Sequence, residues 1–377
     1  MDFSFTEEQE AVRELAGQVF AGYATTERVR QIEASETRVD RDLWRALADA
    51  GLLALAVPEE HEGSGLGLVE LALLLEEQGR RVAPVPVWPT LVLGALPLAE
   101  FGTPEQRQRW LPGVANGEVI LTAALAEQGV NDPLRPHATA TRDGDTWRLD
   151  GVKPSVPAAH VADRVLVPAT TGDDELGVFV VDPAGPGVDR TVAATTDRAK
   201  VAHLAFAGAP AEHLGENRVG EEEIDGRNAT AWMLDRALVG LCALQVGVAE
   251  GALRMAAEYT SERHQFGRPL STFQGVALKA ADAYIDTEAM RVTLWQAAWR
   301  LTAGRDATRE VIVAKWWAAE GGQRVVHITQ HLHGGMGADV DYPVHRYFLW
   351  GKQIEDTLGG ASAQLARLGR ALAEAPA

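Results

Sequence analysis

The stretch Leu234-Asp-Arg-Ala-Leu-Val-Gly-Leu-Cys-Ala-Leu-Gln-Val-Gly-Val248 is the clearest structural signal in this chain of 377 residues. Its large apolar residues recur at helical steps, and the same stripe continues to Met255 and Tyr259. An apolar stripe at this spacing is typical of a helix that packs one face against a core. We therefore predict a long core helix from Asn228 onward.

Helical runs follow this stretch to the C-terminus. Apolar periodicity predicts helices at residues 273–303, 306–333 and 343–372. Together with the first helix, they indicate a C-terminal four-helix bundle over residues 228–377. Apolar residues on more than one helix face predict that the bundle packs against other bundles, unless all of them belong to its internal core. These residues include Trp295, Trp299, Trp316 and Trp317.

Before the bundle, residues 121–227 have the pattern of a β-domain. Short β-prone runs such as Arg164-Val-Leu-Val167 and Leu176-Gly-Val-Phe-Val-Val181 are divided by Asp-Gly, Gly-Asp and Pro-Gly turns. Residues 1–120 are helical in pattern, with Thr6 as an N-cap. This order predicts an α+β fold with an N-terminal helical domain, a middle β-domain and the C-terminal bundle. A Rossmann domain is disfavoured, because the sequence has neither a βαβ rhythm nor a GxGxxG motif after a strand.

Composition narrows the classes of partner. The net charge of −18 and the pI near 5.0 argue against a nucleic acid or an anionic membrane, because binding to either depends on clustered Lys and Arg. The only cysteine, Cys242, excludes an intramolecular disulfide and a cysteine-based zinc site, and its apolar surroundings indicate a buried hydrophobe. Neither a signal peptide nor a transmembrane span is indicated, so we expect a cytoplasmic protein.

Several segments carry a family resemblance. Arg263-His-Gln-Phe-Gly-Arg-Pro-Leu-Ser-Thr-Phe-Gln274 and His333-Gly-Gly-Met-Gly337, followed by Asp341-Tyr-Pro343, resemble the flavin-contacting and assembly segments of acyl-CoA dehydrogenases. The opening Phe5-Thr-Glu-Glu-Gln9 and Gly151-Val-Lys153 also fit that family. Each motif alone is a weak signal. Their occurrence together, in the family's order and over nearly the whole chain, identifies the sequence as a member.

The resemblance implies an FAD-dependent oxidoreductase that desaturates an acyl-CoA thioester between C2 and C3 and passes electrons to an acceptor. A carboxylate removes the C2 proton while a hydride leaves C3 for the flavin. Arg263 would pair with the FAD pyrophosphate, Phe266 would pack on the cofactor, and glycines would let backbone amides approach phosphate. The cofactor-binding residues that the resemblance implies are Arg263, Gln265, Phe266, Gln274, Gln330, His331, Gly334 and Gly335.

The sequence departs from the family at the segments that serve a subunit's own flavin. The family's Thr-Glu-Pro and Gly-Ser-Asp correspond to Ala126-Glu-Gln-Gly-Val-Asn-Asp-Pro133, and its Trp-Ile-Thr corresponds to Ser155-Val-Pro157. These changes remove hydrogen-bond donors and the cover of the ring. Gly359 stands where the catalytic glutamate is usual, and Ala361 stands where a threonine reaches the cofactor. Glycine cannot accept a proton, although its backbone N–H could donate to an oxyanion.

A second position for the base is Asp235, because some members carry a glutamate directly before an arginine there, and Arg236 follows it. The alternative is an aspartate that only pairs with a neighbouring arginine. Glu320 and Glu355 are weaker candidates for the base. The histidines at 327, 331 and 333 lack nearby acidic ligands in the sequence, so we predict no metal site.

The retained segments are those that reach a neighbouring subunit's FAD in the family tetramer. The leading hypothesis is therefore a partner subunit, resembling the degenerate chains of actinobacterial α2β2 steroid-type acyl-CoA dehydrogenases, whose second subunit supplies the base. Three alternatives stay open. They are a self-sufficient homotetramer that uses Asp235, a flavin oxidase or hydroxylase on the same fold, and a non-catalytic scaffold.

Overall fold

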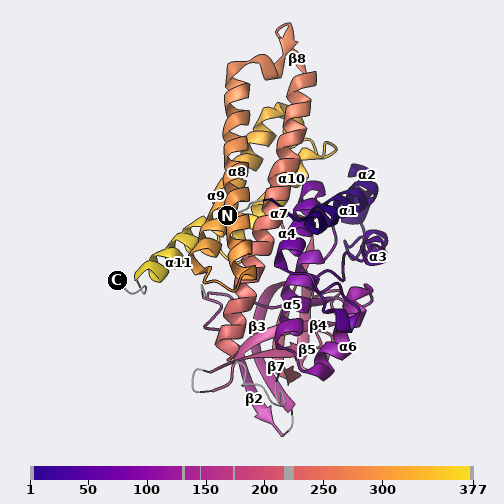
Figure 1. Cartoon of the computed structure of the whole chain (residues 1–377), viewed down its shortest axis with the longest axis vertical. Coiled ribbons are helices and arrows are strands. Elements are labelled where there is room, and N and C mark those ends of the chain that lie inside the picture. Colours follow the sequence, from indigo (N-terminus) through magenta and orange to yellow (C-terminus); the bar gives the residue numbers. More distant parts are fainter. Residues whose placement is uncertain (1–3, 130–131, 145, 173–174, 216–224, 374–377) are drawn as a thin grey trace.

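The computed structural model describes residues 4–129, 132–144, 146–172, 175–215 and 225–373. Helices at the N-terminus, a sheet, and long helices at the C-terminus follow one another along the chain (Figure 1), as the sequence predicts. The N-terminal elements are α1 (Glu7–Tyr23), α2 (Thr26–Glu33), α3 (Arg41–Asp49), α4 (Leu68–Arg81), the π-helix η2 (Trp88–Ala95), α5 (Leu96–Phe101) and α6 (Pro104–Ala115), with a 3-10 turn η1 (Glu59–His61).

Local capping explains where the N-terminal helices begin. The Thr6 hydroxyl accepts a hydrogen bond from the Gln9 amide at 3.2 Å, and the Gln9 side chain accepts one from the Thr6 amide. Thr6 is thus the predicted N-cap of α1. Asp40 caps α3 through the amides of Asp42 and Leu43 and also binds Arg28 on α2. This ion pair ties the two short helices together.

The β-region is one mixed sheet with strand order β1-β4-β2-β3-β7-β5, and β6 pairs with β7. Most pairs are antiparallel, and β4 runs parallel to β1 and β2. One face carries its own apolar core, which includes Leu149, Phe179 and Leu204. The strands are β1 (Leu121–Ala123), β2 (Thr139–Asp143), β3 (Thr146–Pro157), β4 (Arg164–Thr170), β5 (Leu176–Val181), β6 (Val188–Ala194) and β7 (Lys200–His213).

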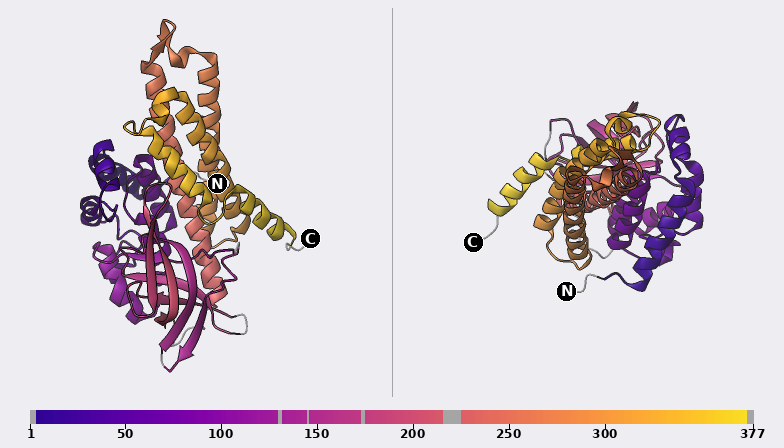
Figure 2. Two further views of the ribbon diagram at one scale, coloured as in Figure 1. Left: turned by 180° about the vertical axis from the view of Figure 1, so that it is seen from behind. Right: turned by 90° about the horizontal axis from the view of Figure 1, so that it is seen from above.

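The C-terminal helices form the long axis of the molecule (Figure 1). They are α7 (Gly226–Glu262), α8 (Gln274–Thr302), α9 (Thr308–Leu332), α10 (Val344–Asp356) and α11 (Ala361–Ala373). A two-stranded hairpin, β8 (His264–Gln265) with β9 (Arg268–Pro269), and a turn η3 (Leu270–Thr272) join α7 to α8, and η4 (Gly334–Ala338) follows α9. One prediction is wrong here: the helical run at 343–372 is two helices, and α11 leaves the bundle at an angle (Figure 2).

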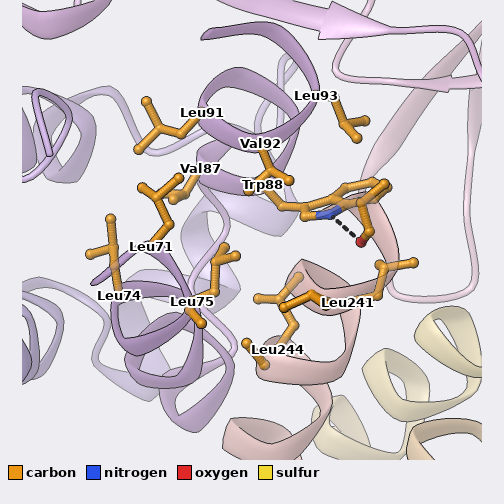
Figure 3. Close-up of a cluster of buried hydrophobic side chains, with 14 of the residues drawn as sticks. Leu71, Leu74, Leu75, Val87, Trp88, Leu91, Val92, Leu93, Leu241 and Leu244 are labelled. Atoms are coloured by element: carbon orange, nitrogen blue, oxygen red, sulfur yellow. Dashed lines mark hydrogen bonds between the residues drawn. The ribbon is translucent and has the colours of Figure 1, made fainter. Parts of the chain in front are cut away.

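The helix α7 is the centre of the packing. It is long and apolar enough to cross a membrane, but its apolar window is 72% buried inside the protein, as expected of a core helix. It approaches α4 closely at Gly247, where an added Cβ would lie 2.0 Å from the Glu76 carbonyl oxygen. The indole N–H of Trp88, on η2, donates to the Ala237 carbonyl at 3.0 Å (Figure 3). The N-terminal domain and the bundle therefore share one core.

Candidate functional site

A cavity of about 370 Å³ lies where the N-terminal helices, the sheet and the bundle meet. Its buried walls come from α4, the segment after it, and α7, and they include Trp88, Leu241 and Leu244. Other parts of the wall are Ala126, Ser155, Pro157 and Thr357. The structure thus brings together the three segments in which the sequence departs from the family. Val130 and Asn131, within the first of these segments, lie outside the described residues.

The first two segments are held by a buried ion pair that the sequence analysis missed. The Lys153 ammonium lies 2.5 Å from Oε1 of Glu127, and the two side chains are 1% and 5% exposed. Glu127 also accepts hydrogen bonds from the amides of His137 and Ala138. Burial alone would raise the pKa of Glu127, but Lys153 and the two amides lower it. The pair joins the loop after β1 to strand β3, whose mixed polar and apolar sequence does not signal it.

Strand β3 is irregular where it lines the cavity. Its register with β7 shifts between Lys153 and Val156, and Ser155 has φ = 52°. The exposed Ser155 donates its backbone N–H to Nδ1 of His203 at 3.2 Å. The irregular strand thus presents Ser155, a short side chain, at the position where the resemblance predicts an aromatic side chain that covers the flavin ring.

The segment after α10 is locked in a left-handed turn. Leu358 has φ = 58° and Gly359 has φ = 97°, a region that side chains disfavour. Nε2 of the fully buried Gln364 donates to the carbonyls of Leu358 and Gly359 at 3.2 and 3.0 Å. The Gly359 N–H donates to the Asp356 carbonyl at 3.1 Å. That amide is already used, so the expected oxyanion donor at Gly359 is not available in this structure.

The C-terminal end of α10 is held by a second residue that the sequence analysis missed. Nζ of Lys315, on α9, is fully buried and donates to the carbonyls of Ile354 and Glu355 at 3.0 and 2.9 Å. Burial lowers the pKa of Lys315 to about 8, against the opposing effects of Cys242 and two carboxylates. Helix-end carbonyls need such donors. The sequence signal for its burial is the apolar run on both sides of it, Val311 to Ala314 and Trp316 to Ala319.

Asp235, the candidate base, lies on α7 and is not part of the cavity wall. Burial raises its pKa to about 6, while Arg367 on α11 and the adjacent Arg236 oppose the rise. Within the described ranges, no ion pair or hydrogen bond engages the Asp235 carboxylate. The Arg236 guanidinium instead stacks 3.5 Å above the Trp232 ring, and burial lowers the pKa of Arg236 to about 10. The weaker candidates Glu320 and Glu355 are engaged in pairs with Arg324 and Lys352.

Four of the residues predicted to contact FAD, those of the segment 263–274, lie around β8 at the opposite end of the bundle from the sheet (Figure 1). Arg263 and Gln265 are exposed, and Phe266 is 92% exposed with φ = 55°. The Phe266 and Phe273 rings pack edge to face, with 6.1 Å between their centroids. Gln274, the first residue of α8, is also exposed. An aromatic ring this exposed in a chain's own fold indicates a surface that contacts another molecule.

The turn η4, which follows α9, also leaves space around its backbone. Gly334 has φ = 58°, and a Cβ added at Gly334 or Gly335 would meet no atom within 4 Å. Gln330 donates its Nε2 to the Gly337 carbonyl at 2.9 Å, whereas His331 is exposed. Gln330 therefore shapes the turn, and His331 is the one of the two that is free to reach outward.

The three histidines of this region do not converge. His333 is buried, with Nδ1 at 2.7 Å from the Thr329 carbonyl and its ring stacked on Tyr259, whereas His327 packs edge-on against Phe348. Among the described residues, no group of three or more His, Cys, Asp or Glu side chains is placed to hold a metal ion.

Comparison with known proteins places this geometry in a family. Models of the acyl-CoA dehydrogenase N-terminal and C-terminal domains match residues 6–118 and 225–372. The chain therefore belongs to the acyl-CoA dehydrogenase family, whose members are FAD-dependent oxidoreductases.

Among individual proteins, the chain is similar to the acyl-CoA dehydrogenase FadE27 of Mycobacterium tuberculosis, with 42% identity over 385 residues that cover 100% of both sequences. It is 53% identical to a chain in a solved structure of the Tcur3481-Tcur3483 steroid ACAD, with a TM-score of 0.92 and 98% of both chains covered. It is 42% identical to a chain of the ChsE4-ChsE5 complex from Mycobacterium tuberculosis, with a TM-score of 0.92 over 100% of both chains.

The described residues fit one half of an FAD site better than the other. At the hairpin end, a free guanidinium, an exposed ring and two unobstructed glycines suit a pyrophosphate and its neighbouring groups. At the cavity, the Gly359 amide is used internally, and the short side chains of Ser155 and Ala126 stand at positions where the resemblance predicts ring-facing residues. This division is the main feature of the site.

Proposed function

We propose that this chain is the partner subunit of an α2β2 acyl-CoA dehydrogenase and contributes half of a shared FAD site. Its hairpin end, with Arg263, Phe266 and Gly335, would meet the cavity of a second acyl-CoA dehydrogenase-like subunit. That subunit would supply the base and the cover of the flavin ring. The observation that carries the proposal is the exposure of the retained contacts at one end of the chain, combined with the internal use of hydrogen-bond groups at its own cavity.

The reaction assigned to the complex is the family's α,β-desaturation of an acyl-CoA, in which FAD accepts the hydride. Arg263 would neutralise pyrophosphate charge, and the turn at Gly334 and Gly335 would donate backbone amides. The description of one similar structure as a steroid ACAD supports a CoA ester of a steroid side chain as substrate. A separate electron-transfer acceptor and a cytoplasmic location complete the proposal.

An exposed apolar stripe supports an assembled state. Leu278, Ile285 and Val292 are 58%, 62% and 61% exposed and lie seven residues apart on α8, so they share one helix face. Trp295, Trp299, Trp316 and Trp317 are half-buried instead. Light scattering should therefore show an oligomer at micromolar concentration, and a monodisperse monomer in the presence of the second subunit would contradict a shared FAD site.

The direct test is the FAD content of this chain alone and after co-expression with a second family member that has intact flavin motifs. We expect little or no FAD in the chain alone and about one FAD per pair of different subunits in the complex. One FAD per chain in a homogeneous preparation of this chain would instead select the self-sufficient enzyme. The raised pKa of Asp235 favours that second candidate, because a carboxyl group with a pKa near 6 suits proton transfer.

A further inference from the structure

His333 is a buried side chain at the base of the exposed glycine turn η4. It is 1% exposed and forms the C-cap of α9, directly before Gly334, whose φ of 58° is left-handed. A glycine in this conformation is a common way for a helix to end. The last carbonyls of a helix lack intrahelical donors, and Nδ1 of His333 donates to one of them, that of Thr329, at 2.7 Å. The side chain thus caps the helix that carries the turn.

Three aromatic rings from different segments meet at this cap. The His333 imidazole stacks on Tyr259 of α7, with 4.7 Å between the ring centroids and 28° between the planes. It also lies against Tyr342, in the segment before α10, with 5.2 Å between the centroids. Aromatic pairs favour particular geometries beyond the apolar area that they bury. The ring of His333 therefore joins α7, the end of α9 and the segment before α10 at the point where the turn begins.

The far end of the turn is fixed as well, whereas its first glycines are open. Gln330 donates its Nε2 to the Gly337 carbonyl at 2.9 Å, and an added Cβ at Gly337 would lie 2.4 Å from the Gln330 carbonyl oxygen. Gly334 and Gly335 lie between the two anchors and are exposed. The direction in which they present their backbone therefore depends on the anchors at His333 and at Gln330.

The surroundings of His333 favour its neutral form. Burial lowers its pKa below the ordinary value of 6.5, although the carbonyls of Thr329 and Met255 oppose the shift. Because Nδ1 carries the proton that Thr329 accepts, Nε2 is the unprotonated nitrogen of the neutral ring. It is buried and has no hydrogen-bond partner among the residues that the structure describes. An imidazolium would therefore be a buried charge.

The other titratable groups around this ring are the tyrosines and two glutamates of α7. Tyr259 and Tyr342 face the imidazole directly. Burial, and after it the charges of Tyr259, Glu258 and Glu262, raise the pKa of Tyr342. Within the described ranges, no carboxylate forms an ion pair with His333. The histidine is thus the group of this cluster that titrates near neutral pH.

We propose that His333 is a positioning residue, whose hydrogen bond and ring contacts hold the turn so that Gly334 and Gly335 present their backbone to the shared FAD. The inference rests on the proposed function and adds to it a residue that the predicted cofactor contacts leave out. At 1% exposure His333 does not touch the cofactor itself, so it acts through the turn.

Two substitutions separate the hydrogen bond from the ring. His333→Asn places an amide nitrogen near the position of Nδ1 and cannot titrate, whereas His333→Phe keeps a ring against Tyr259 and leaves the Thr329 carbonyl without its donor. His327→Phe, at an exposed histidine of the same helix, is the matched control. At pH 7.5, the dissociation constant of FAD from the complex should rise about tenfold in His333→Phe, by less than about threefold in His333→Asn, and not at all in the control.

Acidification gives a readout that a purely structural side chain would not produce. Because the pKa of His333 is lower in the folded chain than its unfolded value of 6.5, its contribution is complete above pH 6.5. That contribution is lost as the pH falls from 6.5 toward the folded pKa. Between pH 7.5 and pH 5, FAD retention by the wild type should therefore fall relative to that of His333→Asn. A constant ratio between the two proteins over this range would contradict the role of the neutral ring.

Amide exchange in the isolated chain separates this inference from the proposed function, because it needs no FAD. The Asp339 amide donates to the Met336 carbonyl at 3.2 Å in the wild-type turn. Mass spectrometry of residues 333–339 should show faster exchange in His333→Phe than in His333→Asn, the control and the wild type. A wild-type complex without FAD would contradict the proposed function, and the exchange rates would still decide the role of His333. Equal exchange in all four proteins, or equal FAD retention by His333→Phe and the wild type, would overturn that role.

Discussion

The two ends of this molecule differ in whether their polar groups are bound within the fold. At the cavity, hydrogen-bonding groups bind one another: the Gly359 amide is taken by Asp356, and Gln364 holds the carbonyls of the turn. At the hairpin end, Arg263 and Phe266 point away from the fold, and the glycine turn has open space around it. Polar groups that are paired within the fold are not available to a ligand, whereas exposed groups can still bind a partner or a cofactor. This difference makes each end separately testable.

The largest effect is expected at the cavity end, from Glu127→Gln. This change leaves the Lys153 ammonium buried without its carboxylate, and removing one member of a buried pair costs about 3–5 kcal/mol. Urea unfolding at pH 7 measures the loss. Glu118→Gln, an exposed change in the same region, is the control and should cost less than about 0.5 kcal/mol.

If the pair is structural, Glu127→Gln combined with Lys153→Met should recover much of the stability, because no unpaired charge is then buried. If Glu127→Gln leaves the free energy of unfolding unchanged but lowers FAD retention in the complex, the view that the cavity end does not bind FAD is wrong. The cavity end of this chain would then take part directly in cofactor binding.

At the hairpin end, Arg263→Ala should weaken FAD retention in the assembled complex without changing the stability of the chain. Loss of a charge-assisted contact of about 1.5–3 kcal/mol corresponds to about a 10- to 100-fold change in the dissociation constant. Arg254→Ala, which removes an exposed arginine of α7 before the hairpin, is the matched control. Equal FAD affinity in the Arg263 variant and the wild type would contradict the assignment of Arg263 to the shared FAD site.

Gly335→Val tests the backbone part of the same half-site. The added side chain meets no atom within 4 Å in this chain, so folding should be unaffected. In the complex it would stand between the backbone amides and the phosphates, and FAD retention should fall as in Arg263→Ala. A fall in the thermal stability of the isolated chain would show instead that the turn tolerates no side chain.

A smaller effect is expected from Asp235→Asn on stability. Burial raises the pKa of Asp235 from 3.8 to about 6, so ionised Asp235 destabilises the folded state at pH 7. The asparagine variant should therefore be more stable than the wild type by about 1–2 kcal/mol above pH 6. The gain should shrink as the pH falls from 6 to 4, because the carboxyl group becomes protonated in the folded protein while it is still largely ionised in the unfolded chain. Denaturant titrations at pH 7 and pH 4 measure both values.

Sequence patterns predicted the parts of this structure that depend on local periodicity. The start of α1 at Thr6, the β-region and the long core helix follow from capping residues and apolar spacing. The break after Asp356 was missed, because apolar residues continue at helical spacing while Gln364 and Lys315 impose the turn from other helices. The motifs located the segments that gather at the cavity, but the Glu127–Lys153 pair depends on tertiary contacts that spacing does not encode.

The smallest effect is expected from Asp235→Asn on the rate of flavin reduction. This measurement decides whether this chain or the second subunit supplies the base. If Asp235 is the base, the change should lower the rate of flavin reduction by acyl-CoA by about 100-fold or more, with folding and FAD binding intact. If the second subunit supplies the base, stopped-flow reduction of the complex should change by less than about twofold. We expect the small change, because Asp235 does not line the cavity and its carboxylate faces Arg367 on α11. Gly359→Glu should not create activity either, since φ = 97° disfavours any side chain and an added Cβ would lie 3.1 Å from that of Ala363. Flavin reduction by this chain alone, abolished in Asp235→Asn, would make it a catalytic subunit and remove the distinction between its two ends.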